Sequence, residues 1–128
     1  MSEGRSQRVL VVIQNSVFRE TVCYLLAADA HFMIAAQAES GEAALALKEG
    51  LEIDLALVDI HLPGMGGFAT ATALKMTDPH LIILILSGEW SSAYERKAKA
   101  AGITARLAKQ TFSLSELYRV LDSARSMT

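Results

Sequence analysis

The chain has little cysteine and no long apolar run, and each shortage excludes a class of protein. Cys23 is the only cysteine in 128 residues, so the chain forms no internal disulfide and no cysteine-based metal cluster. No apolar segment is long enough to cross a bilayer, and Met1 to Arg8 is too polar for a secretion signal. We therefore expect a cytoplasmic protein without membrane contact.

A large charge of one sign is also missing. The net charge is −2 at pH 7, which lacks the basic surplus typical of nucleic-acid binding, so we expect no direct contact with nucleic acid. Apolar residues make up 52% and charged residues 20%, and this balance predicts a compact fold rather than disorder. No linker divides the sequence, so we assign residues 1–128 to one domain without a second, output domain.

Short apolar runs alternate with helical patterns along the chain. A continuous apolar run bounded by turn residues is typical of a buried parallel strand, whereas apolar residues three and four positions apart indicate a helix. The alternation predicts an α/β fold, a doubly wound parallel sheet with helices on both faces. We expect strands over 9–13, 32–38, 54–59, 81–86 and 103–108, and helices beginning near residues 16, 41, 67, 91 and 114.

Two helices carry more detailed predictions. Ser113, followed by Glu116 three residues later, resembles a capping box and predicts the start of the last helix. In the helix that begins near residue 41, we expect Ala43, Ala44 and Leu47 on the inner side.

Three expected strands end at polar side chains, namely Asp59, Ser87 and Lys109. The carboxyl ends of parallel strands are where open α/β sheets bind ligands, so these side chains are expected at one rim. A carboxylate there is a potential nucleophile toward a phosphoryl group. The lysine ammonium is suited to a phosphoryl oxygen, and the serine hydroxyl can donate to another.

Each of these residues also has a purely structural alternative. Asp59 alone is compatible with a turn cap, and Lys109 alone with an ion pair to Asp59 that does no chemistry. Ser87 alone is compatible with a helix or turn cap. The presence of all three behind apolar strands favours a shared site.

These motifs resemble the receiver domains of two-component response regulators, from about Arg8 to Arg125. The segments that carry the resemblance are Val58–Gly67, Leu86–Gly88, Ala101–Gly102 and Leu107–Lys109. In addition, Phe18-Arg19-Glu20 resembles the subgroup of LuxR or NarL type, which carries a helix-turn-helix output domain.

The resemblance implies a flavodoxin-like (CheY-like) domain with five helices and the strand order 2-1-3-4-5. It implies that Asp59 is the phosphoacceptor, Ser87 the switch hydroxyl and Lys109 the phosphate-sensing lysine. It also implies a signalling domain that is not an enzyme, with a histidine kinase or another signalling protein as its partner.

The sequence departs from the family where the first strand ends. Family members carry two acids there that help to hold Mg²⁺, whereas the corresponding residues here are Ile13 and Gln14. Asp59 and the backbone carbonyl of His61 remain as potential ligands, but Mg²⁺ favours several carboxylate and water oxygens. We therefore predict weak or absent Mg²⁺ binding and impaired phosphorylation of Asp59, because phosphoryl transfer depends on the metal.

A second departure lies three residues before the lysine, where Arg106 replaces the usual aromatic residue that swings inward on activation. We expect this arginine not to bury in the same slot; a solvated arginine guarding an edge strand is the alternative. In the family, the fourth helix, fifth strand and fifth helix commonly form a dimer or partner face. Trp90, Tyr94, Arg106 and Tyr118 are expected on or near it, although Trp90 and Tyr94 are also compatible with simple packing.

Two functional hypotheses follow. One is an atypical receiver that works through protein–protein interaction, which Ile13 and Gln14 favour. The other is a conventional receiver that accepts a phosphoryl group on Asp59 and controls a LuxR-type DNA-binding domain, which Asp59, Ser87 and Lys109 favour. A small flavodoxin-like enzyme or flavin carrier fits less well, because the loop after the first strand lacks phosphate-binding glycines.

Overall fold

The computed structural model describes residues 6–126, and side chains up to Ala124. The first five residues of the polar stretch Met1 to Arg8 lie outside this part. The elements are β1 (Gln7–Val12), α1 (Ser16–Ala27), β2 (Phe32–Ala38), α2 (Gly41–Lys48), β3 (Leu55–Asp59), α3 (Gly66–Thr77), β4 (Ile82–Ser87), α4 (Ser92–Ala101), β5 (Ala105–Ala108), a 3₁₀ turn (Lys109–Thr111) and α5 (Leu114–Ser126).

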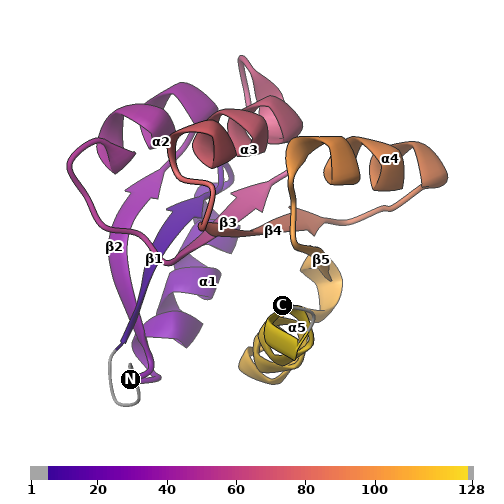
Figure 1. Ribbon diagram of the computed structural model, residues 1–128. Coiled ribbons are helices and arrows are strands. Elements are labelled where there is room, and N and C mark those ends of the chain that lie inside the picture. Colours follow the sequence, from indigo (N-terminus) through magenta and orange to yellow (C-terminus); the bar gives the residue numbers. More distant parts are fainter. Residues whose placement is uncertain (1–5, 127–128) are drawn as a thin grey trace.

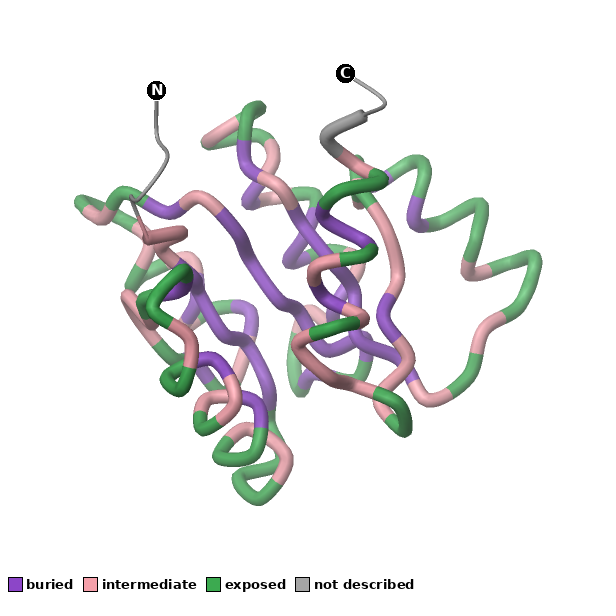
Figure 2. The backbone as a smooth tube through the Cα atoms, turned by 90° about the horizontal axis from the view of Figure 1, so that it is seen from below, coloured by how far each residue is buried: buried purple, intermediate pink, exposed green. Residues whose placement is uncertain are grey.

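The five strands form one parallel sheet in the order β2-β1-β3-β4-β5, which confirms the predicted fold and strand order (Figure 1). β3 lies at the centre and all five of its residues are buried. Burial on both faces explains why its sequence reads as a continuous apolar run. Figure 2 shows the same pattern, because the buried residues concentrate along the strands.

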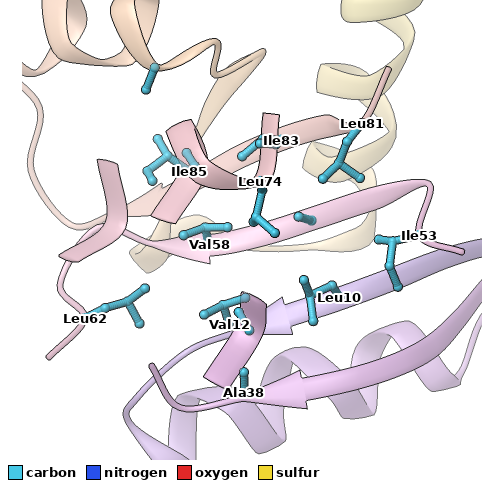
Figure 3. Packing of buried hydrophobic residues seen from close by; sticks show 14 of the residues in the cluster. Leu10, Val12, Ala38, Ile53, Val58, Leu62, Leu74, Leu81, Ile83 and Ile85 are labelled. Carbon is cyan, nitrogen blue, oxygen red and sulfur yellow. The ribbon is translucent and has the colours of Figure 1, made fainter. Parts of the chain in front are cut away.

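Successive strand residues point to opposite faces of the sheet, and so divide the core into two clusters. In β3, Leu55 and Leu57 belong to the cluster under α1 and α5. Ala56 and Val58 belong to the cluster under α2, α3 and α4, which Figure 3 shows from close by. Each fully buried aliphatic side chain stabilises the fold by about 2 kcal/mol.

The helices begin where polar side chains accept hydrogen bonds from their first turns. The Ser113 hydroxyl accepts from the Glu116 N–H at 3.1 Å, as the capping box predicts. Ser91 accepts from the Tyr94 N–H, so α4 begins one residue later than expected. β5 begins two residues later than expected, because the Ile103 N–H donates to the Ala98 carbonyl and closes the end of α4.

The prediction that Leu47 faces inward is wrong, since this side chain is 41% exposed. Gly41 and Ala44 are buried, and the Lys48 stem continues their face of α2. Lys48 reaches Asp78 from this position, with 3.6 Å between its Nζ and a carboxylate oxygen. Leu47 lies in the turn between Ala44 and Lys48 on the outer side of α2, so its side chain points toward solvent.

α5 is attached to the turn before β2 through Tyr118. The Tyr118 hydroxyl donates to Asp29, and its ring packs against that of Phe32 with centroids 5.5 Å apart. Tyr118 therefore lies on the α1 side of the sheet. This corrects the expectation that it shares a face with the aromatic residues of α4.

The same contact gives the fold a pH dependence. The hydrogen bonds from Tyr118 and from the His31 N–H hold the pKa of Asp29 below its usual 3.8. Burial, together with the neighbouring carboxylate, raises the pKa of Tyr118 to about 12. The contribution of Asp29 to stability is complete above pH 3.8 and is lost as the pH falls through its lowered pKa. That of Tyr118 is complete below pH 10 and is lost as the pH rises toward 12.

We expect Asp29→Asn to lower the free energy of unfolding at neutral pH, because asparagine lacks the charge that strengthens both hydrogen bonds. The difference from the parent chain should shrink on acidification below pH 3.8. Urea unfolding across this pH range measures it. A difference that stays constant down to acid pH would contradict the role assigned to the ionised carboxylate.

Candidate functional site

Asp59, Ser87 and Lys109 lie at one rim of the sheet, where β3, β4 and β5 end. Asp59 is 2% exposed, and its Oδ1 lies 2.8 Å from the Nζ of Lys109. β4 runs between β3 and β5, so this ion pair joins two strands that are not neighbours in the sheet. The acid and the amine are therefore in direct contact. The sequence predicted that they lie at one rim, and it left this ion pair open as a purely structural alternative.

Ser87 is buried at the end of β4, but its hydroxyl is engaged in the turn that follows. It donates to the Glu89 carbonyl and accepts a hydrogen bond from the Glu89 N–H at 3.2 Å. This is the turn-cap arrangement that the sequence left open as an alternative. The structure thus brings the hydroxyl to the same rim, where the backbone of Glu89 holds it.

The loop after β3 fixes the orientation of the Asp59 carboxylate. The His61 N–H donates to Asp59 Oδ1 at 2.9 Å. The loop then returns so closely that a Cβ on Gly67 would lie 2.5 Å from the Asp59 carbonyl oxygen. A glycine at this position lets α3 begin directly against the strand end.

An aromatic pair lines the other side of Lys109. Its Nζ lies 5.8 Å from the centroid of the Phe18 ring, within the range of a cation–π interaction. Phe18 in turn meets Phe112 edge to face, with centroids 6.5 Å apart. Nothing in the sequence indicates that Phe18 approaches Lys109, because the two residues are 91 positions apart and only the fold brings them together.

The end of β1 carries Ile13 and Gln14 at the same rim. The Ile13 side chain is buried in the core cluster under α1 and α5. The backbone carbonyls of both residues accept hydrogen bonds from Arg19 Nη1, at 2.8 Å and 3.3 Å. Arg19 belongs to the motif Phe18-Arg19-Glu20, and nothing in the sequence indicates its contact with these carbonyls.

Arg106 and Trp90 form a second cluster beside the rim, between β5 and α4. The Arg106 guanidinium lies 5.4 Å from the centroid of the Trp90 ring, and its Nη2 donates to the Ser87 carbonyl at 3.1 Å. Trp90 also packs against Tyr94, with centroids 5.9 Å apart. Arg106 is therefore not the solvated arginine of the alternative, because its guanidinium lies over an aromatic face and donates to a buried backbone acceptor. That it does not occupy the slot of the family's aromatic residue stays a prediction.

This arrangement of acid, hydroxyl and amine occurs in a chain that matches a known family. A family model described as the response regulator receiver domain matches residues 9–122. The chain belongs to the response regulator receiver domain family. It is a receiver of the kind found in two-component response regulators; such domains interact with histidine kinases and are in general not enzymes.

Similar curated proteins carry this receiver as one part of a longer chain. A protein-glutamate methylesterase/protein-glutamine glutaminase of Anaeromyxobacter dehalogenans is 32% identical over 93% of this chain and 35% of its own length. The probable transcriptional regulatory protein NarL of Mycobacterium tuberculosis is 29% identical over 98% of this chain and 59% of its own length. The chain thus spans between about a third and three fifths of these relatives.

Solved structures show the same fold for the receiver. The signal receiver domain of the putative response regulator NarL from Mycobacterium tuberculosis matches with a TM-score of 0.84 at 29% identity, covering 94% of this chain and 97% of that one. The chemotaxis protein CheY4 of Vibrio cholerae matches with a TM-score of 0.81 at 29% identity, covering 93% and 98%. Within residues 6–126, no helix of the receiver has the length and apolar character needed to cross a membrane.

The buried ion pair of the receiver can be tested by removing its cation. We expect Lys109→Met to lower the free energy of unfolding by about 2 kcal/mol at neutral pH, because it leaves a buried carboxylate without its charged partner. Urea unfolding monitored by circular dichroism measures this change.

Asp59→Asn is the matched variant, because asparagine keeps the shape of the side chain and still accepts from the His61 N–H. The double variant Asp59→Asn/Lys109→Met should lose less stability than the sum of the two single changes. Strictly additive losses would show that the two groups do not interact.

Proposed function

We propose that this receiver is atypical: it acts mainly through protein–protein contacts, and metal-dependent phosphorylation of Asp59 is weak or absent. The observation that carries the proposal is the end of β1. There, Ile13 and Gln14 replace a pair of acids, and the Arg19 guanidinium already binds both backbone carbonyls.

The groups at this rim do not fit a tightly bound Mg²⁺. The ion requires about six oxygen ligands, and carboxylates are preferred among them. Asp59 supplies one carboxylate, which is already paired with Lys109. Among the described residues, no group of three or more His, Cys, Asp or Glu side chains is arranged to hold a metal ion. The positive charge of Arg19, bonded to the β1 carbonyls, further opposes a divalent cation.

Without a metal, the chain offers little to stabilise phosphoryl transfer to Asp59. Charge that develops on a phosphoryl group must be neutralised by fixed cations or dipoles. Lys109 can orient one phosphoryl oxygen, but it would have to leave Asp59 to do so. The Ser87 hydroxyl would have to leave its bonds to Glu89. Both groups are thus held in a resting arrangement.

The side of the domain that carries α4 is suited to contact a partner. Trp90 and Tyr94 pack together there, and tryptophan and tyrosine are frequent anchors in protein interfaces. A histidine kinase, another signalling protein or a second copy of the chain are the classes of partner this proposal includes. The relative named as a transcriptional regulatory protein suggests transcription control as the setting.

The second candidate is a conventional phospho-accepting receiver, the input part of a regulator with a LuxR-type DNA-binding domain. The direct contact between Asp59 and Lys109 favours it, because this places a nucleophile and a phosphate-binding cation together. Magnesium affinity separates the two candidates.

We expect the Trp90 fluorescence of the chain to stay flat when Mg²⁺, and then beryllofluoride as a phosphoryl analogue, are added at millimolar concentration. Trp90 is the only tryptophan and lies beside the turn that follows Ser87. A saturable response that Asp59→Ala abolishes would support the conventional receiver and overturn the proposal.

Gln14→Asp should create a magnesium response, because it returns one anionic ligand to the end of β1. Asn15→Asp is the matched control: it adds the same charge one residue away, where the side chain caps α1 and aspartate caps equally well. A response to both variants would indicate a general charge effect instead of a restored ligand.

A further inference from the structure

The Arg106 guanidinium is only partly satisfied in its position between β5 and α4. Its Nη2 donates to the Ser87 carbonyl at 3.1 Å. Its Nε is buried, and within the described part of the chain no atom accepts a hydrogen bond from it. A buried donor without an acceptor costs free energy, and more so when the group is charged. The Arg106 side chain would therefore gain free energy by moving to an acceptor that bonds Nε as well as Nη2.

A hollow of about 330 Å³ opens beside this group. Its lining combines apolar and cationic side chains, among them Trp90, Ala98, Lys99, Ile103 and Arg106. Glu95 also lines it, but this carboxylate accepts a hydrogen bond from the Trp90 indole N–H at 3.1 Å. The hollow thus combines two cationic side chains and one carboxylate with apolar residues.

The chemistry of the hollow selects a carboxylate next to an apolar group. A guanidinium presents Nε–H and Nη2–H side by side, and a carboxylate accepts from both at once. The Ser87 carbonyl, with its single oxygen, engages only one of these two donors. Lys99 adds attraction for a negative charge, and Ala98 and Ile103 offer contact to an aliphatic side chain.

We propose that this hollow is a docking site for an aspartate or glutamate side chain of a partner protein, flanked by an apolar residue, with Arg106 as its receptor. The inference rests on the proposed function, in which partner contacts control the domain. Arg106 then has two arrangements: inward on the Ser87 carbonyl, as in this structure, and outward on the acid of the partner.

The exchange connects the partner face to the Asp59 rim. When Arg106 leaves the Ser87 carbonyl, the turn that holds the Ser87 hydroxyl loses one side-chain hydrogen bond. It keeps the bond from Gln110 Nε2 to the Gly88 carbonyl at 3.0 Å, so the change reaches the turn as a weakening of its attachment to β5. Binding free energies at linked sites are reciprocal, so a change at the rim alters the affinity for the acid by the same factor. In this proposal, Arg106 performs the role of the aromatic side chain that is usual at this position in the family.

The probe for this site is 4-methylpentanoate, which joins a carboxylate to a short branched chain, and its neutral counterpart is 4-methylpentanamide. The complete 128-residue chain is titrated with each compound in the absence of metal. Trp90 fluorescence and the nuclear magnetic resonance signals of the Trp90 indole and of the Gly88 and Glu89 amides are recorded. We expect a saturable response to the carboxylate in the millimolar range and none to the amide.

Variants separate specific binding from a general charge effect. Arg106→Met should abolish the response, and Arg106→Lys should weaken it by about tenfold, because an ammonium keeps the charge but lacks the fork. Arg96→Met is the matched control, since it removes one exposed cation from α4 outside the lining of the hollow. A thermal melt of each variant shows that it is folded.

An equal response to the amide, or an unchanged response in Arg106→Met, would overturn the proposal. So would a response of the indole that leaves the Gly88 and Glu89 amides unmoved, because the link to Ser87 would then be absent. The magnesium titration of the β1 end involves other residues, so failure here leaves the proposed function to be decided by its own experiment.

Discussion

The ion pair between Asp59 and Lys109 is the interaction on which the rim of this receiver depends. A buried carboxylate is costly unless it is paired and hydrogen-bonded, and here it has both a cation at 2.8 Å and the His61 N–H. The pair reaches past β4 and so ties the end of β3 to the turn after β5. Whatever acts on this rim must compete with that contact.

Positive side chains hold the oxygens at the rim of the sheet. Lys109 neutralises the acid, and Arg19 closes off the carbonyls at the end of β1. Arg106 does the same for the Ser87 carbonyl. Each of these three cations bonds an oxygen at the carboxyl end of a different strand. The geometry of the rim is therefore held by contacts within the domain.

The fold could be predicted because its strands are short apolar runs and its helices begin at recognisable caps. Asp59 and Lys109 could be placed together for the same reason: strand ends of a parallel sheet converge. What the sequence could not give is the direction of long side chains. Arg106 turns inward because the Trp90 face and the Ser87 carbonyl lie within its reach, and the position of Trp90 depends on the packing of α4 against the sheet. The direction of the Tyr118 side chain likewise depends on its hydrogen bond to Asp29, a partner 89 positions away in the sequence.

The division of the core by the sheet has a consequence for how this domain tolerates change. Side chains under α2, α3 and α4 do not pack directly with those under α1 and α5, because the strand backbones lie between the two clusters. Substitutions in opposite layers are then coupled only weakly. Substitutions that suit new binding partners can therefore accumulate in one layer, while the side chains of the other layer maintain the fold.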